Sequence, residues 1–94
     1  MRARSKGLLG RSGLAPGEGL LITKTSSIHT FFMRFAMDAV YLDKSLRVRA
    51  VVPAIAPYRI SWRLGAKSVL ELAAGEAARV GIREGSQLSW HDPM

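Results

Sequence analysis

The stretch from Thr30 to Asp43, TFFMRFAMDAVYLD, constrains the fold more than any other part of the chain. It contains all three phenylalanines and two of the four methionines of the protein. Such an apolar stretch in a small protein is expected inside, because burial of apolar surface is the main favourable term in folding. Asp38 is the anomaly, since a buried carboxylate costs several kcal/mol unless it is paired or hydrogen-bonded. We therefore expect the chain to fold around this segment, with Asp38 drawn inside.

The length of 94 residues predicts one domain over residues 1–94 with a single hydrophobic core. The composition of 48% apolar and 22% charged residues is typical of a globular protein. Within the domain, residues 1–15 are predicted to form a short helix, with Leu8 and Leu9 on the core, or an arm. Residues 19–90 are predicted to form the core.

Cysteine is absent from the sequence, so disulfides, zinc–thiolate sites and thiol catalysis are excluded. After the basic start, only Leu8 and Leu9 stand where a signal peptide would need a longer apolar block. No run approaches the roughly 18 apolar residues of a membrane span. We therefore expect a soluble, cytoplasmic protein.

Alternating and apolar runs predict several short strands, separated by turns rich in glycine and proline. In the run from 38 to 42, Val40 and Leu42 share one face, and Ala39 and Tyr41 share the other. In the run from 46 to 52, apolar side chains point one way and Arg47 and Arg49 the other, and Pro53 is expected to end the strand. The strands are expected at 19–23, 38–42, 46–52, 67–72 and 87–90, with a polar loop at 24–29 and a hairpin turn at 43–45.

Residues 54–67 are harder to interpret, and their alternation predicts a short edge strand or an ordered loop. Residues 73–80 have the composition of a helix, with Gly81 placed for a left-handed cap and Ile82 for the apolar contact of a Schellman motif. The whole pattern predicts a mainly β (α+β) fold, a small antiparallel barrel or sandwich with one or two short helices.

Several motifs resemble those of the DUF192 (UPF0127) family. They lie in the same order and spacing over nearly the whole chain and read GEGLLI at 17–22, HTFFMRFAMDAVYLD at 29–43, VLELAAG at 69–75 and GIREGSQL at 81–88. The resemblance implies a compact, mostly β fold with short helices. It implies no activity, because the family is one of uncharacterised function.

Asp38 and Glu71 are the acids that interrupt apolar runs. Two carboxyl groups that face one cavity can differ in pKa and act as an acid–base pair, so a small hydrolase or lyase is one hypothesis. The alternative is structural, because a buried aspartate at a strand start commonly accepts backbone N–H bonds or pairs with an arginine. Whether the protein is an enzyme therefore stays open.

Our leading hypothesis is a non-enzymatic domain that binds an unidentified small ligand or protein partner near the central stretch. A polar loop, an anomalous acid and an aromatic run are expected to meet there. The candidate residues are His29, Thr30, Phe32, Asp38, Arg59 and Glu71. The histidines lack the spacing of a metal site, and no phosphate-binding glycine loop is present, so neither metal nor cofactor is expected.

A second binding hypothesis rests on charge. The chain has 14 Lys and Arg against 7 Asp and Glu, a formal net charge of +7 that suits a polyanionic partner. Aromatic rings that alternate with arginines can bind single-stranded nucleic acid, because bases stack on rings while guanidinium groups contact phosphates. If the aromatic side chains instead face the core, the arginines serve only as solubilising charge. The residues concerned are Arg47, Arg49, Tyr58, Arg59, Trp62 and Arg63.

Overall fold

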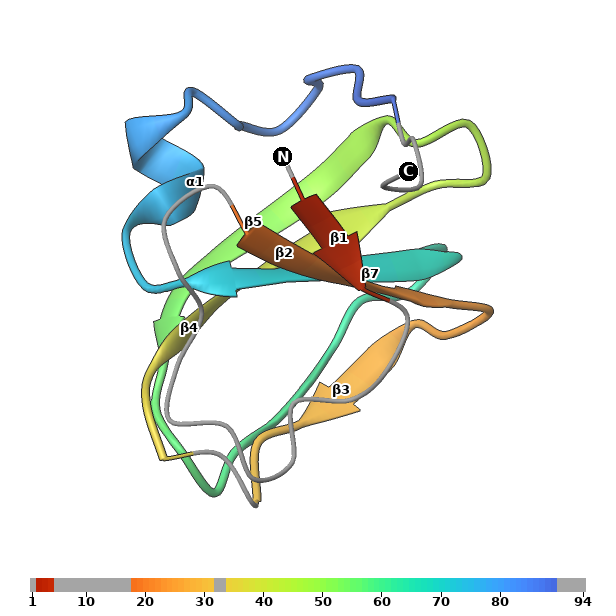
Figure 1. The fold of residues 1–94 in the computed structure, drawn as a ribbon. Coiled ribbons are helices and arrows are strands. Elements are labelled where there is room, and N and C mark those ends of the chain that lie inside the picture. The colour runs from red at the N-terminus through yellow and green to blue at the C-terminus, as the bar shows by residue number, and fades with distance from the viewer. Residues whose placement is uncertain (1, 5–17, 32–33, 90–94) are drawn as a thin grey trace.

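A computed structural model describes residues 2–4, 18–31 and 34–89 of the chain. These residues form a mainly β fold with antiparallel sheets and one short helix, as the sequence predicted (Figure 1). The elements in chain order are β1 (Arg2–Arg4), β2 (Glu18–Thr23), β3 (Ser27–His29), β4 (Met37–Leu42), β5 (Val48–Ile55), β6 (Ile60–Trp62), β7 (Ser68–Ala73) and α1 (Glu76–Arg79).

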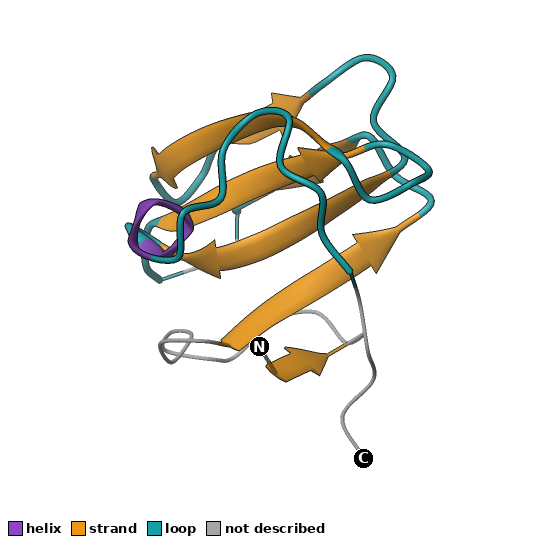
Figure 2. Cartoon of the chain, turned by 90° about the horizontal axis from the view of Figure 1, so that it is seen from above, coloured by secondary structure: helices purple, strands orange, loops and turns teal. Residues whose placement is uncertain are grey.

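The main sheet has five strands in the order β1-β2-β7-β4-β5. β1 pairs with β2 in parallel, and the other neighbours pair antiparallel. β3 and β6 form a separate antiparallel pair, which we call the ribbon. Figure 2 shows strands of the main sheet running alongside one another, with α1 at one end.

Both faces of the main sheet are covered. On one face, Val40, Leu42 and Leu70 pack with Ala77 of α1 and with side chains from the segment that follows the helix. On the other face, Ala39 and Tyr41 pack with Ile28 of the ribbon. Figure 1 accordingly shows α1 and the ribbon strand β3 on opposite sides of the sheet. Every residue of β4 is buried as a result.

The predicted faces of β4 are confirmed, since Val40 and Leu42 belong to one apolar cluster and Ala39 and Tyr41 to the other. The hairpin turn after β4 is also confirmed. The Asp43 carbonyl accepts a hydrogen bond from the Leu46 backbone N–H at 3.0 Å, and the Asp43 side chain accepts one from the Ser45 N–H at 2.8 Å.

β5 differs from its prediction in two ways. One extra residue, Arg49, lies between the pairs Tyr41–Ala50 and Leu42–Val48, so Val48 and Ala50 face opposite sides of the sheet instead of the same side. The strand also continues through Pro53 to Ile55. Pro53 is tolerated because β5 is an edge strand and a second bulge lies at this point.

Three further segments differ from expectation. Arg2–Arg4 is a strand, where a helix or an arm was predicted, while Leu8 and Leu9 lie outside the described residues. The polar loop predicted at 24–29 contains β3, in which Ile28 is buried between the exposed residues Ser27 and His29. The strand predicted at 87–90 is reduced, in its described part, to a bridge between Arg47 and Gln87.

The helix is shorter than predicted, because Ala73 completes β7 and a turn follows it. Its end is the predicted Schellman motif. The Ile82 N–H donates to the Ala77 carbonyl at 2.8 Å, and the Gly81 N–H donates to the Ala78 carbonyl at 3.2 Å. Gly81 has a φ of 81°, the left-handed conformation that this motif requires.

Candidate functional site

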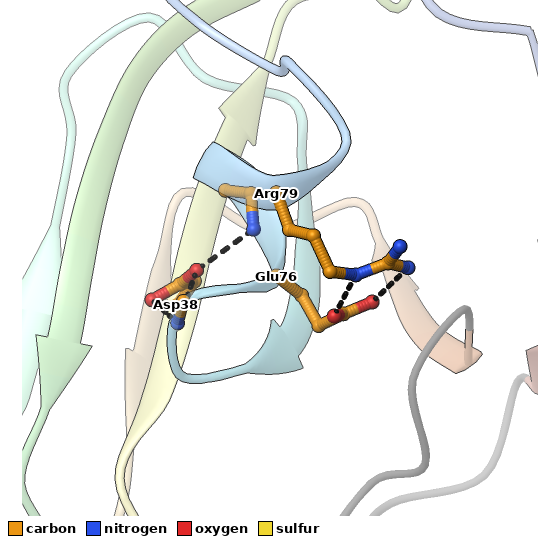
Figure 3. A network of polar contacts seen from close by, with 5 residues as sticks. Asp38, Glu76 and Arg79 are labelled. Atoms are coloured by element: carbon orange, nitrogen blue, oxygen red, sulfur yellow. Dashed lines mark hydrogen bonds and ion pairs between the residues drawn. The ribbon is translucent and has the colours of Figure 1, made fainter.

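Asp38 is a structural anchor on the face of the sheet that α1 covers (Figure 3). It accepts hydrogen bonds from the backbone N–H groups of Ala54 at 3.0 Å, Gly75 at 3.1 Å and Ala77 at 2.9 Å. One carboxylate therefore joins β4 to the bulge of β5 and to the first turn of the helix. These bonds account for the burial of the charge, because a carboxylate that accepts several N–H bonds regains much of the stabilisation it had in water.

Figure 3 also shows an ion pair within α1. The Arg79 Nη2 donates to Glu76 Oε2 at 2.9 Å, and the Arg79 Nε donates to the other oxygen of the same carboxylate. This pair raises the pKa of Arg79. The ion pair lies within α1, on the opposite side of the main sheet from the ribbon (Figure 1).

Glu71 lies on the opposite face of the main sheet from Asp38. It pairs with Leu20 of β2 and Ala39 of β4, and Ala39 faces the ribbon side. The side chain is only 2% exposed, and its Oε2 accepts no hydrogen bond from any described residue. Burial raises the pKa of Glu71 to about 7, from an ordinary value of 4.5.

The positions of the two acids remove the basis of the acid–base hypothesis. Asp38 and Glu71 belong to strands that pair in register, and Ala39 pairs with Glu71 while Asp38 pairs with Leu72. Since neighbouring residues of a strand point to opposite faces, the two carboxyl groups are separated by the sheet. They cannot face one cavity as a catalytic pair.

Thr30 is buried and holds the loop between β5 and β6. Its hydroxyl group donates to the Ala56 carbonyl at 2.8 Å and accepts from the Arg59 N–H at 2.8 Å. Its backbone carbonyl accepts from the Tyr58 N–H at 2.9 Å. Thr30 therefore fixes the path of residues 56–59, which lead into the ribbon.

The ribbon has an inner and an outer side. Ile28 packs into the core, and Ser61 accepts a hydrogen bond from the Tyr41 hydroxyl group at 2.6 Å. Burial raises the pKa of that tyrosine. We call the opposite side the outer face: it consists of the outward residues of the paired strands together with the exposed apolar residues at their ends. These residues are Ser27, His29, Phe31, Tyr58, Ile60, Trp62 and Leu64.

The aromatic side chains of the outer face are directed to solvent. Tyr58 is 70% exposed and Trp62 is 69% exposed, and Leu64, at the following turn, is 90% exposed. Of the two alternatives left open by the sequence, the structure therefore selects the one in which the rings face outward. A group of large apolar side chains this exposed is typical of an interaction surface.

The charges around the outer face have one sign. Residues 24–31 and 56–67 contain Lys24, Arg59, Arg63 and Lys67 but no aspartate or glutamate. All four basic side chains are exposed. The two arginines flank β6 at its two ends, and each directly follows an exposed ring in the chain, Arg59 after Tyr58 and Arg63 after Trp62.

Arg47 and Arg49, the other two arginines predicted to bind nucleic acid, lie apart from each other. Arg49 reaches the turn after β6, since a β-carbon on Gly65 would lie 2.9 Å from its Nη2 atom. Arg47 instead donates from Nη1 to the Gly85 carbonyl at 3.4 Å, at the end of the sheet where the last described segment pairs with β5. Arg47 is thus not part of the outer face.

The predicted ligand site is divided by the fold. His29 is exposed beside Phe31, with ring centroids 5.3 Å apart, and Arg59 is exposed directly before β6, where its Nη1 donates to the Tyr58 carbonyl at 3.4 Å. Thr30 and Glu71 are buried beneath it, and Asp38 lies across the sheet. Phe32, the sixth predicted residue, lies outside the described residues.

Sequence reasoning did not select four members of the outer face, which are Ser27, Phe31, Ile60 and Leu64. Ile60 could have been found from its alternation with Arg59 and Ser61, had the outward direction been known. Leu64 stands directly before Gly65, and a large apolar residue at a turn is a signal of exposure. Within residues 2–4, 18–31 and 34–89, no three acidic or histidine side chains are grouped to hold a metal ion.

The described part of the chain contains no helix that is long and apolar enough to cross a membrane. A search among curated proteins found no match. Two solved structures share the fold. The first is a protein of unknown function from Novosphingobium aromaticivorans DSM 12444, with a TM-score of 0.81 and 26% identity over 90% of this chain. The chain spans 66% of that protein's length, just under two thirds.

The second is described as a "putative transcription regulator" from Sinorhizobium meliloti 1021. Its TM-score is 0.79 at 24% identity, and the match covers 88% of this chain and 70% of the other. At this identity the likeness shows the fold alone. The model of the family DUF192, described as "Uncharacterized ACR", matches residues 1–90. The chain, whose motifs already resemble those of that family, therefore belongs to DUF192.

Proposed function

We propose that this protein is a non-enzymatic binding domain whose outer face binds single-stranded nucleic acid. The observation that carries the proposal is the exposure of Tyr58 and Trp62, at 70% and 69%. Each of these rings is directly followed in the chain by an arginine. Exposed rings offer stacking surfaces to unpaired bases, and the arginines next to them in the chain can contact the phosphates. The cytoplasmic location expected from the composition stays a prediction.

The charge distribution supports a polyanionic partner over a neutral one. The two segments that build the outer face carry basic residues and no acids, and Asp38 and Glu71 of the main sheet are buried. These two segments therefore present only positive charge to a negatively charged strand. Basic charge on its own would not specify a surface, but here it belongs to the same two segments as the exposed rings.

The proposal is tested by fluorescence anisotropy with a labelled twelve-nucleotide oligo(dT) or oligo(U). Trp62→Leu should weaken binding by about 5- to 150-fold, because stacking of one base on a ring is worth about 1–3 kcal/mol. Trp62→Phe keeps a ring and should lose much less. This pair of variants separates stacking on a ring from simple apolar contact, which leucine would largely preserve.

Salt dependence provides the second measurement. If Arg59 and Arg63 each neutralise one phosphate, the affinity should fall by about sevenfold between 50 and 200 mM salt, since each contact to a single strand contributes about 0.7 to the logarithmic slope. Arg63→Gln should reduce that slope. Arg83→Gln makes the same charge change at an exposed residue in the segment after α1 and should leave the slope nearly unchanged.

A flat anisotropy titration at 50 mM salt would refute the proposal. Equal affinities of Trp62→Leu and the wild type would also refute it, because the rings would then not contact the bases. If the chain binds a protein partner and Trp62→Leu preserves that binding, the outer face is an apolar protein-docking surface and not a nucleic-acid-binding one.

A further inference from the structure

The most strained backbone position on the outer face belongs to one of its exposed rings. Tyr58 has a φ of 63°, in the left-handed region that bulky residues rarely adopt. Its side chain is 70% exposed, so packing of the ring into the core does not compensate for the strain. Strained residues persist only where surrounding contacts over-determine them, and they cluster at functional sites.

The contacts that hold Tyr58 come from Thr30. The Thr30 carbonyl accepts from the Tyr58 N–H at 2.9 Å, and the Thr30 N–H donates to the Arg59 carbonyl at 2.8 Å. The hydroxyl group of Thr30 accepts from the Arg59 N–H at 2.8 Å and donates to the Ala56 carbonyl at 2.8 Å. Thr30 therefore bonds to the loop both before and after Tyr58, at Ala56 and at Arg59.

Thr30 itself is unsuited to direct contact with a ligand, because it is only 1% exposed. Both of its neighbours in the chain that carry rings, His29 and Phe31, are exposed and contact each other. The buried hydroxyl group thus lies directly beneath the surface, between two exposed rings and the loop that carries a third.

We propose that Thr30 is a positioning residue that fixes Tyr58 and Arg59 in the orientation in which the outer face binds its ligand. This inference rests on the proposed function and deepens it: the ring and the guanidinium group at positions 58 and 59 are preorganised by the hydroxyl group beneath them. Preorganisation raises affinity because the ordering of the loop is completed before the ligand binds.

Three variants test the inference with the same twelve-nucleotide oligonucleotide. Thr30→Val keeps the branched shape and removes the hydroxyl group, and we expect its affinity to fall about tenfold. Thr30→Ser keeps the hydroxyl group and should bind within about twofold of the wild type. The decisive measurement is a double-mutant cycle with Tyr58→Gly, since glycine adopts a φ of 63° without strain.

If Thr30 acts through Tyr58, Thr30→Val should cost less than about twofold in the Tyr58→Gly background. A merely structural role predicts a lower melting temperature, an unchanged affinity of the folded protein and no coupling between the two positions. An affinity of folded Thr30→Val equal to that of the wild type would overturn the inference. Equal losses in both backgrounds would overturn it as well.

Amide hydrogen exchange tests the inference without the oligonucleotide, and its wild-type measurement also needs no variant. In the wild type, the Tyr58 and Arg59 amides should be protected, and in Thr30→Val they should exchange at least tenfold faster while amides of β4 and β7 do not change. Unprotected Tyr58 and Arg59 amides in the wild type would overturn the inference even if Thr30→Val fails to fold. Absence of oligonucleotide binding by the wild type would refute the proposed function, whereas these exchange rates would still decide the role of Thr30.

Discussion

Glu71 makes the stability of this protein depend on pH in a direction opposite to that of most carboxylates. The side chain is 2% exposed between the main sheet and the ribbon, and its Oε2 accepts no hydrogen bond from the described residues. Burial raises its pKa to about 7 from 4.5. The protonated form is therefore the one that the fold favours.

The sign and size of the effect follow from proton linkage. Below pH 4.5 Glu71 is protonated in both the folded and the unfolded chain, and its contribution to stability is fully present. As the pH rises from 4.5 to about 7, the unfolded chain releases the proton while the folded chain retains it, so the free energy of unfolding falls. The whole difference between the two pKa values corresponds to roughly 3 kcal/mol, of which about 2.5 kcal/mol is lost between pH 5 and pH 8.

Glu71→Gln removes the titration and keeps the size of the side chain. Urea unfolding followed by far-UV circular dichroism at pH 5, 6, 7 and 8 should show the variant gaining about 2–3 kcal/mol relative to the wild type across this range. Glu84→Gln, at an exposed position, is the control and should follow the wild-type curve. Parallel pH profiles for Glu71→Gln and the wild type would refute the reasoning, because Glu71 would then ionise in the folded protein as it does in water.

Two further predictions concern bonds that join the layers, and both are measured by urea unfolding at constant pH. Asp38→Ala leaves the backbone N–H groups of Ala54 and Ala77 without an acceptor and should lower the free energy of unfolding by about 2–4 kcal/mol. A loss below about 0.5 kcal/mol, with binding abolished, would instead mark Asp38 as functional. Tyr41→Phe removes the hydrogen bond to Ser61 and should cost about 0.5–1.5 kcal/mol, and an unchanged stability would show that this bond does not hold the ribbon.

The sequence was most informative for a strand that is buried on both faces along its whole length. The two faces of β4 were predicted because Val40 and Leu42 on one face, and Ala39 and Tyr41 on the other, are all apolar, and a strand buried on both sides has this composition. The end of α1 was also predicted, since Gly81 and Ile82 carry a local signal that does not depend on distant contacts.

β5 could not be predicted in full because its register depends on its partner strand. The alternation from 46 to 52 assumes an uninterrupted strand, but Arg49 forms a bulge and moves Val48 to the opposite face from Ala50. The passage of the strand through Pro53 likewise depends on a distant residue, because the carboxylate of Asp38 takes up the Ala54 N–H group that the bulge leaves free.

The candidate site was predicted in its residue types and not in its location. Proximity in the sequence grouped Thr30 and Asp38 with His29. In the fold, Thr30 and Asp38 are both buried but bind different segments of the backbone, and only the histidine is exposed. The direction of Trp62 could not be read from alternation, because an alternating strand has two sides and the sequence does not say which one faces the core.

The ribbon offers a matched pair of residues that tests this difference between its sides. Ile28 and Ile60 lie on the two paired strands, with Ile28 buried at 7% exposure against the main sheet and Ile60 61% exposed on the outer face. Threonine keeps the branched shape that suits a strand, so each substitution changes mainly the polarity of the side chain. Ile28→Thr should cost about 2 kcal/mol of stability in urea unfolding, because it removes apolar contact and buries a hydroxyl group. Ile60→Thr should stay within about 0.5 kcal/mol of the wild type, and a loss as large as that of Ile28→Thr would show that the outer face is packed and not available to a partner.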